Sequence, residues 1–163
     1  MNDAAVIKVE NVSLAFGGVQ ALYNIDTRLF GGEIFAIIGP NGAGKTTTIK
    51  MIGGILAPSS GSVHVAGIDL LKEPEKAKSK IGFIPDRPYL YEKLTGMEFL
   101  KFTADLYGVP EDRFNAKARQ NLEMFSLADW SNELIESYSH GMKQRLIMSA
   151  ALLHDPRVII VDE

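Results

Sequence analysis

Alternating apolar and polar residues predict several short strands in the first half of the chain. Residues 6–14 alternate loosely and are rich in Val and Ile, which is typical of a strand, and residues 22–29 predict a second strand after a turn at 16–18. Residues 62–67 alternate again behind a turn cluster at 57–61 and indicate a half-buried strand. We expect these strands to form an antiparallel layer at the periphery of the fold.

Two denser apolar runs favour strands that are buried on both faces. Residues 33–38 read Glu-Ile-Phe-Ala-Ile-Ile, and residues 158–161 read Val-Ile-Ile-Val. Short runs of this kind are typical of central strands in a parallel sheet. Polar residues 72–80 predict a short helix, and residues 81–84 predict a further strand that Pro85 stops.

The second half of the chain has the spacing of helices. Thr95 and Glu98 have the capping-box spacing, which predicts a helix from there to about Tyr107. Apolar residues at helical spacing predict two more helices, one marked by Phe114, Ala118, Leu122 and Phe125 with Trp130 near its end, and one marked by Met142, Leu146, Ala150 and Leu153. We expect these aromatic side chains to pack in the core rather than against a cofactor.

Residues 39–47 read Gly-Pro-Asn-Gly-Ala-Gly-Lys-Thr-Thr, which matches the pattern G-x-x-x-x-G-K-[ST]. Glycines let successive backbone N–H groups curl around a polyphosphate, and a helix predicted from Lys45 to Leu56 adds the positive end of its dipole. Lys45 would place a cation on the β- and γ-phosphates, while the Thr46 hydroxyl is the expected Mg²⁺ ligand. The alternative, a chance glycine-rich turn, is disfavoured because a strand and a helix flank the loop in the required order. The residues expected around the nucleotide are Gly39, Pro40, Asn41, Gly42, Ala43, Gly44, Lys45, Thr46 and Thr47.

Two carboxylates, Asp162 and Glu163, close the chain behind the apolar run at 158–161. Ligands of open α/β sheets bind beyond the carboxyl ends of the strands, so we expect both side chains to face the phosphate loop. A solvated turn is the alternative for a carboxylate pair at this position.

Composition narrows the class of protein. A chain of 163 residues is long enough for one domain with a core, and the absence of Cys rules out disulfides and thiolate metal sites. A net charge of −3 gives no general attraction to nucleic acid. No apolar stretch reaches the roughly 18–20 residues of a membrane-spanning helix, and the N-terminus lacks the features of a signal peptide, so we expect the chain by itself to be soluble.

These motifs together resemble the nucleotide-binding domain of an ATP-binding-cassette (ABC) transporter. Residues 39–47 resemble its Walker A loop and residues 158–163 its Walker B strand, while residues 138–145, Tyr-Ser-His-Gly-Met-Lys-Gln-Arg, resemble the family signature Leu-Ser-Gly-Gly-Gln in a form similar to the exporter branch. The resemblance implies an α/β fold, a P-loop NTPase core with a mostly parallel sheet. Residues 1–86 would form an antiparallel β subdomain and the Walker A part of the core, residues 87–138 a helical subdomain, and residues 139–163 the signature helix and Walker B strand.

The resemblance also implies further site residues. Two domains of the family pair head to tail, so Ser139 and Gly141 would cap ATP on a partner domain, although Ser139 also suits an ordinary helix N-cap. Phe16 matches the aromatic that stacks on adenine, or it packs on the core as a surface-strand residue. Asp86 stands where the family has a glutamine that senses Mg²⁺; it would reach the metal's water shell, or it is a polar turn residue.

The function that the resemblance implies is Mg²⁺-dependent ATP hydrolysis coupled to a separate membrane permease, on the cytoplasmic face of the membrane. Glu163 would polarise the attacking water and Asp162 would bind Mg²⁺, while residues 88–91 would contact the permease or only cover the local core. A ribosome-associated ATPase without a permease and a non-hydrolysing ATP-dependent interaction module remain as alternatives. Cargo is chosen by the permease and cannot be deduced.

The resemblance further implies that segments of the family fold lie beyond Glu163. These are a loop at the dimer interface, the next central strand and a switch histidine, whose position none of His64, His140 and His154 occupies. We therefore expect a truncated piece of the domain, as a fragment or a shortened gene model, that binds nucleotide without turning it over.

Overall fold

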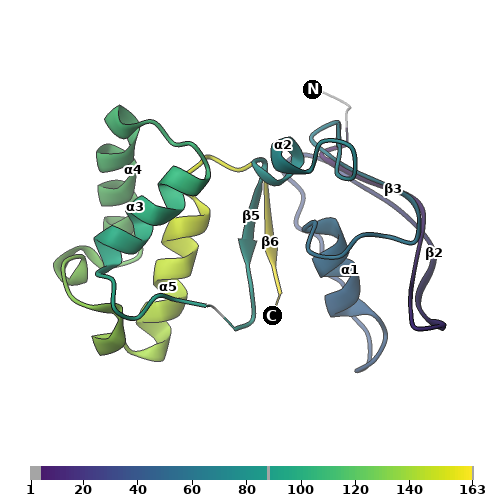
Figure 1. The fold of residues 1–163 in the computed structure, drawn as a ribbon, viewed down its shortest axis with the longest axis horizontal. Coiled ribbons are helices and arrows are strands. Elements are labelled where there is room, and N and C mark those ends of the chain that lie inside the picture. Colours follow the sequence, from purple (N-terminus) through teal and green to yellow (C-terminus); the bar gives the residue numbers. More distant parts are fainter. Residues whose placement is uncertain (1–4, 88, 163) are drawn as a thin grey trace. The chain divides into compact units, whose positions relative to one another are not determined.

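The computed structural model describes residues 5–87 and 89–162 (Figure 1). These residues form two compact units, one of residues 5–81 together with Asp162 and the other of residues 82–161 without 88. The first unit contains β1 (Ile7–Phe16), β2 (Val19–Leu29), α1 (Lys45–Ile52), β3 (Ser60–Val65), β4 (Ile68–Asp69) and α2 (Pro74–Lys78). The chain continues with β5 (Ile81–Ile84), α3 (Gly96–Leu106), α4 (Glu111–Met124), the short 3₁₀ helices η1 (Ala128–Trp130) and η2 (Ile135–Ser137), α5 (His140–Ala151) and β6 (Val158–Val161).

The four early strands form one antiparallel sheet in the order β2-β1-β3-β4, as the sequence predicts. The loose alternation in β1 has a local cause. Ile7 and Val9 are buried, and the next buried residue is Val12 because the register shifts between Val9 and Val12. Asn11, in the left-handed region at φ 49, takes up the extra residue of this bulge. The bulge therefore turns both halves of β1 towards the same core.

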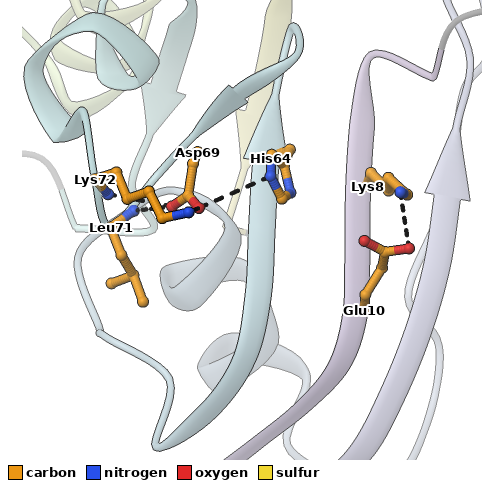
Figure 2. Close-up of polar contacts among 6 residues, drawn as sticks. All are labelled: Lys8, Glu10, His64, Asp69, Leu71 and Lys72. Carbon is orange, nitrogen blue, oxygen red and sulfur yellow. Dashed lines mark hydrogen bonds and ion pairs between the residues drawn. The ribbon is translucent and has the colours of Figure 1, made fainter.

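Charged residues form a row across this sheet. Arg28 in β2 and His64 in β3 both stand opposite Lys8 in β1, and Asp69 in β4 stands opposite His64. Figure 2 shows the ion pair between Lys8 and Glu10, at 2.8 Å, and the Asp69 carboxylate facing His64. Directly opposed residues share one face of a sheet, so this row is polar while the buried residues of β1 form the core.

Residues 33–38 do not form the central strand that the sequence predicts. They belong to no strand in the described part of the chain, and Ile34 and Ile38 are almost fully exposed. A strand needs a hydrogen-bonding neighbour, and the sheet of the first unit does not include this segment. The apolar run alone was therefore insufficient to predict a strand here.

Helix α1 also ends earlier than the sequence predicts, at Ile52 rather than at Leu56. Gly53 is the C-cap, and its N–H donates to the Ile49 carbonyl at 2.8 Å. Gly54 follows in the left-handed region at φ 73, a conformation that ends helices.

The second unit has a helical core between α3, α4 and α5. The capping box of α3 is confirmed, since Thr95 and Glu98 satisfy each other's backbone N–H groups. Phe114, Ala118 and Leu122 are buried as predicted, but Trp130 is 43% exposed. The indole of Trp130 packs edge-on against Tyr138, a residue of the core, and remains partly at the surface. The core consists of Phe99, Leu100, Ala104, Phe114, Ala118, Leu122, Leu127, Ile135, Tyr138, Leu146, Ala150 and Leu153.

Strands β5 and β6 form a two-stranded sheet, and Figure 1 shows their arrows running in the same direction. This confirms strands at 81–84 and 158–161. The prediction that the second is buried on both faces is wrong, since Ile159 and Val161 are about half exposed and Ile160 alone is buried. Ile159 and Val161 share one face of β6 and Val158 and Ile160 the other, so one face of the strand is the more exposed. Within those residues, none of the helices has the length and apolar content needed to cross a membrane.

Candidate functional site

The phosphate loop connects the exposed segment 33–38 to α1, and Lys45 is the first residue of that helix. The Lys45 ammonium reaches back over the loop, where Nζ donates to the carbonyl of Gly39 at 2.9 Å and to that of Pro40 at 3.0 Å. The Ala43 N–H also donates to the Pro40 carbonyl at 3.2 Å. These contacts close the loop around the cation, and the ammonium stays near the surface where an anion can approach it.

Gly44 is held between the loop and β2. Its backbone is left-handed, at φ 87, and it is the N-cap of α1. A Cβ here would stand 2.8 Å from the Leu22 side chain and 3.2 Å from the Ala21 carbonyl oxygen. A glycine is therefore needed at 44 for two reasons: the backbone is left-handed, and there is no space for a Cβ. Sequence reasoning finds the glycine through the motif, but it missed its contact with β2.

The first turn of α1 is available to an anion. Its first backbone bond runs from the Thr48 N–H to the Gly44 carbonyl at 2.8 Å, so the N–H groups of residues 45–47 have no partner within the helix. No acidic residue lies in this turn. Together with the Lys45 ammonium, these N–H groups fit the phosphates of a nucleotide, and the exposed Thr46 hydroxyl is a ligand type that Mg²⁺ takes.

Asp162 is the first of the two carboxylates at the end of the chain. Asp162 belongs to the unit that contains the phosphate loop, and it is 4% exposed. No hydrogen bond or ion pair joins its carboxylate to another described residue. A carboxylate in the same unit as the phosphate loop is a ligand type that Mg²⁺ takes. Glu163 lies outside the described residues.

Phe16 and Asp86 are both accessible. Phe16 is the last residue of β1, opposite Val19, and it is 49% exposed, so it is not a core residue of the sheet. Asp86 lies in a bend after β5, with Oδ2 3.9 Å from Nε of its neighbour Arg87. The position of Asp86 suits a polar turn residue. The contact of Phe16 with adenine and that of Asp86 with the water shell of Mg²⁺ stay predictions.

The signature segment begins α5. Ser139 is its N-cap, with extended φ and ψ angles of −63° and 162°, and its Oγ accepts from the Met142 N–H at 3.3 Å. The helix N-cap interpretation of Ser139 is thereby confirmed, while its contact with a partner's nucleotide stays a prediction. Gly141 is exposed, and a Cβ there would meet no atom of the chain within 4 Å. Neither packing nor backbone conformation within this chain explains a glycine at 141.

Two further residues fix the start of α5, and sequence reasoning missed them. The Tyr138 hydroxyl donates to the Trp130 carbonyl at 2.6 Å, and Arg145 donates from its guanidinium to the Phe125 carbonyl at 2.9 Å. Phe125 is the C-cap of α4, so Arg145 brings a positive charge to the negative end of that helix. A tyrosine beside the signature serine and an arginine on the signature helix were visible in the sequence, but their partners were not.

Comparison with known proteins decides the family. The family model described as ABC transporter matches residues 22–163, which covers the phosphate loop, the signature segment and β6. This chain belongs to the ABC transporter family. The resemblance drawn from the motifs is confirmed, and so is the class of fold, a P-loop NTPase fold with an antiparallel N-terminal sheet, a parallel sheet and helices.

Relatives within the ABC transporter family are ATP-binding proteins. The linearmycin resistance ATP-binding protein LnrL of Bacillus subtilis (strain 168) is 40% identical over 158 residues, which are 97% of this chain and 51% of LnrL. The daunorubicin resistance ATP-binding protein DrrA3 of Streptomyces coeruleorubidus is 34% identical over 163 residues, 100% of this chain and 51% of DrrA3. The chain thus spans about half the length of the curated relatives it matches.

Solved structures of the ABC transporter family have the same fold. The structure of an ATP binding subunit of an ABC transporter superposes with a TM-score of 0.90 at 34% identity and covers 97% of this chain and 66% of that one. CbiO1 from Clostridium perfringens, part of the ABC transporter complex cbiONQ, gives 0.85 at 28% identity, with 99% and 66% covered. Members of this family bind and hydrolyse ATP, so the predicted class of activity is that of the family.

Proposed function

We propose that this chain is the ATP-binding part of an ABC transporter subunit, which hydrolyses ATP to drive transport through a separate membrane permease. The observation that carries the proposal is the phosphate loop, where Lys45, the left-handed Gly44 and the unpaired first turn of α1 make an anion site. Family membership supports ATP as the anion, because the relatives are named as ATP-binding proteins.

In this proposal each residue of the loop has one task. The N–H groups of residues 45–47 hold phosphate oxygens, and Lys45 exchanges its bonds to the Gly39 and Pro40 carbonyls for bonds to the β- and γ-phosphates. Bound Mg²⁺ would neutralise phosphate charge, and Thr46 and Asp162 would hold it. Phe16, half exposed at the end of β1, would stack on the adenine ring.

Hydrolysis would depend on position and charge rather than on a covalent step. Phosphoryl transfer makes few covalent demands on a protein, so a fixed cation and aligned N–H groups supply most of the catalysis. Glu163 would orient and polarise the attacking water. Asp86, exposed in its bend, would reach the water shell of the metal rather than the metal itself.

A second copy would complete the site. Ser139 and Gly141 begin α5 and expose the N-terminus of a 12-residue helix, which favours a phosphate oxygen of a partner's nucleotide. Head-to-tail pairing would place each signature segment on the ATP of the other copy.

The permease would hold the pair at the cytoplasmic face of the membrane. Tyr89, which is 94% exposed, and Tyr91 are suited to contact the permease. Pro88, predicted to share this contact, lies outside the described residues.

The test is titration of the chain with Mg-ATP, by calorimetry, for wild type and for Lys45→Ala. We expect Lys45→Ala to abolish measurable binding, because the loop then lacks its cation. Lys50→Ala is the matched control, since Lys50 lies in the last turn of the same helix, and we expect its dissociation constant to equal that of wild type. Equal dissociation constants for wild type and Lys45→Ala would refute the assignment.

A further inference from the structure

The segment that follows the Asp86 bend is joined to the segment that precedes the signature serine. Residues 92–97 run antiparallel to residues 131–136, and we call this pair the strap. Its backbone bonds connect the Glu136 N–H to the Glu92 carbonyl at 3.1 Å and the Ile135 N–H to the Leu94 carbonyl at 2.9 Å. At its other end the Met97 N–H donates to the Ser131 carbonyl at 2.8 Å, and Thr95 and Leu134 form a β-bridge between these ends.

Glu92 is the residue at which the strap reaches the signature helix. Its carbonyl accepts from Glu136, within the strap, and its carboxylate accepts from Lys143 Nζ at 2.5 Å. Lys143 lies one turn after Ser139 in α5, and its N–H donates to the Ser139 carbonyl at 3.0 Å. One residue therefore holds both the strap and the first turn of the signature helix.

The lysine of the Glu92–Lys143 pair is less exposed than the lysine of a second ion pair on the same strap, while the Glu92 side chain is 56% and the Glu136 side chain 42% exposed. The Lys143 side chain is 23% exposed, whereas that of Lys93, which pairs with Glu136 at the same distance of 2.5 Å, is 84% exposed. The Lys143 contact also lowers the pKa of the Glu92 carboxyl, because the ammonium donates to its ionised form. In the described part of the chain, the ion pair of Lys93 is with Glu136, which also belongs to the strap.

On the opposite side of the same helix, Arg145 holds α5 to the end of α4 through the Phe125 and Ser126 carbonyls, at 2.9 Å and 3.4 Å. Glu92 on the strap and the C-terminus of α4 thus both hold α5, in addition to the bond from the Tyr138 hydroxyl to the Trp130 carbonyl.

We propose that Glu92 is a positioning residue for the signature serine: through Lys143 it couples the segment after the Asp86 bend to the orientation of Ser139. The consequence of this coupling, the capping of a partner's nucleotide, rests on the proposed function. The coupling itself is a property of the chain without nucleotide. Glu92 touches no reacting atom in this proposal and acts through Lys143.

The experiment compares Glu92→Gln and Lys143→Met with the matched control Lys93→Gln, on the whole chain. Amide hydrogen exchange is measured without nucleotide for residues 142–144, which include the Met142 and Lys143 N–H groups that donate to Ser139, with residues 100–106 of α3 as the internal reference. We expect Glu92→Gln and Lys143→Met to raise exchange at 142–144 by about threefold, the scale of one exposed ion pair, and the double variant to raise it no further. Exchanging the charges, with Glu92→Lys and Lys143→Glu together, should restore the wild-type rate.

The inference is overturned if Lys93→Gln raises exchange at 142–144 as much as Glu92→Gln, or if Glu92→Gln raises it no more than it does at residues 100–106 of α3. A second arm measures ATP-dependent pairing of two copies by sedimentation, where Glu92→Gln should weaken pairing with the ATP dissociation constant within about twofold of wild type. Unchanged pairing would also overturn the positioning role. If wild type neither binds ATP nor pairs, the proposed function fails, and the exchange measurement still decides whether Glu92 orients α5.

Discussion

The hydroxyl of Tyr138 occupies the space that a side chain on Gly96 would fill. An ideal Cβ on Gly96 would stand 2.4 Å from this hydroxyl oxygen, which donates to the Trp130 carbonyl at 2.6 Å. Tyr138 is buried, so its hydroxyl needs this acceptor. A tyrosine where the family signature has leucine is thus accommodated by a glycine at the first residue of α3.

This relationship predicts a strong coupling between positions 96 and 138. Gly96→Ala should destabilise the chain by about 1–3 kcal/mol, because the new methyl group collides with the Tyr138 hydroxyl. In a Tyr138→Phe background the same substitution should cost under ~1 kcal/mol, because the hydroxyl oxygen is gone, although the ring carbon 3.4 Å away remains. Urea unfolding of the four members of this double-mutant cycle measures the coupling; additive costs would show that the two residues do not compete for the space.

Gly44 and Gly42 make a matched pair for the phosphate loop. Both are left-handed, at φ 87 and φ 83, but a Cβ at 44 meets Leu22 and Ala21, whereas a Cβ at 42 meets nothing within 4 Å. Gly42→Ala should therefore cost about 1–2 kcal/mol from backbone strain alone, and Gly44→Ala should cost about 1–3 kcal/mol more because it also overpacks against β2. Equal unfolding free energies for the two variants would contradict the steric part of the account.

The phosphate loop and the capping box were predictable because each is specified within a few neighbouring residues. Gly44 ends the loop and Lys45 begins α1 where the motif places them, and Thr95 and Glu98 pair as their spacing requires. A local pattern of donors, acceptors and left-handed residues carries its own geometry. The sequence was sufficient to predict a contact wherever the two residues lie within one helical turn of each other along the chain.

Long-range partners were not predictable in this way. The apolar run at 33–38 matches a central strand in composition, yet strand formation depends on neighbours far along the chain, and the described residues pair none with it. The same holds for Glu92 and Lys143, which are 51 residues apart. Neither residue belongs to a motif by itself, and only the fold brings them together.

The Asp69 carboxylate predicts a pH dependence of stability. Its pKa lies below the usual 3.8 because the N–H groups of Lys72 and Leu71 donate to it, and the Lys72 ammonium is also near (Figure 2). A carboxyl group with a lowered pKa in the folded state stabilises the fold above its unfolded pKa, and this contribution is lost as the pH falls through the folded pKa. We expect wild type to lose more stability than Asp69→Asn between pH 5 and pH 2, since the amide keeps an acceptor but does not titrate.

Urea unfolding at a series of pH values checks this prediction. Asp129→Asn is the control, because Asp129 is exposed and makes no hydrogen bond or ion pair with the residues that the structure describes. Its profile should follow that of wild type. Parallel profiles for Asp69→Asn and wild type below pH 4 would contradict the role given to the two N–H donors.

Ser139 allows the helix cap to be separated from the proposed phosphate contact. Asp and Asn cap helices as well as Ser does, so Ser139→Asp and Ser139→Asn should unfold within about 0.5 kcal/mol of wild type, whereas Ser139→Ala should lose about 1 kcal/mol with the bond to the Met142 N–H. ATP-dependent pairing should follow a different order. Ser139→Asp should abolish pairing, because it brings a negative charge to the γ-phosphate of the partner's nucleotide, while Ser139→Asn should weaken it only a few-fold. The contrary result is that ATP-dependent pairing ranks the variants as the unfolding free energies do, so that Ser139→Asp pairs as well as wild type. Ser139 would then be a helix cap only, and the signature segment would not belong to the nucleotide site.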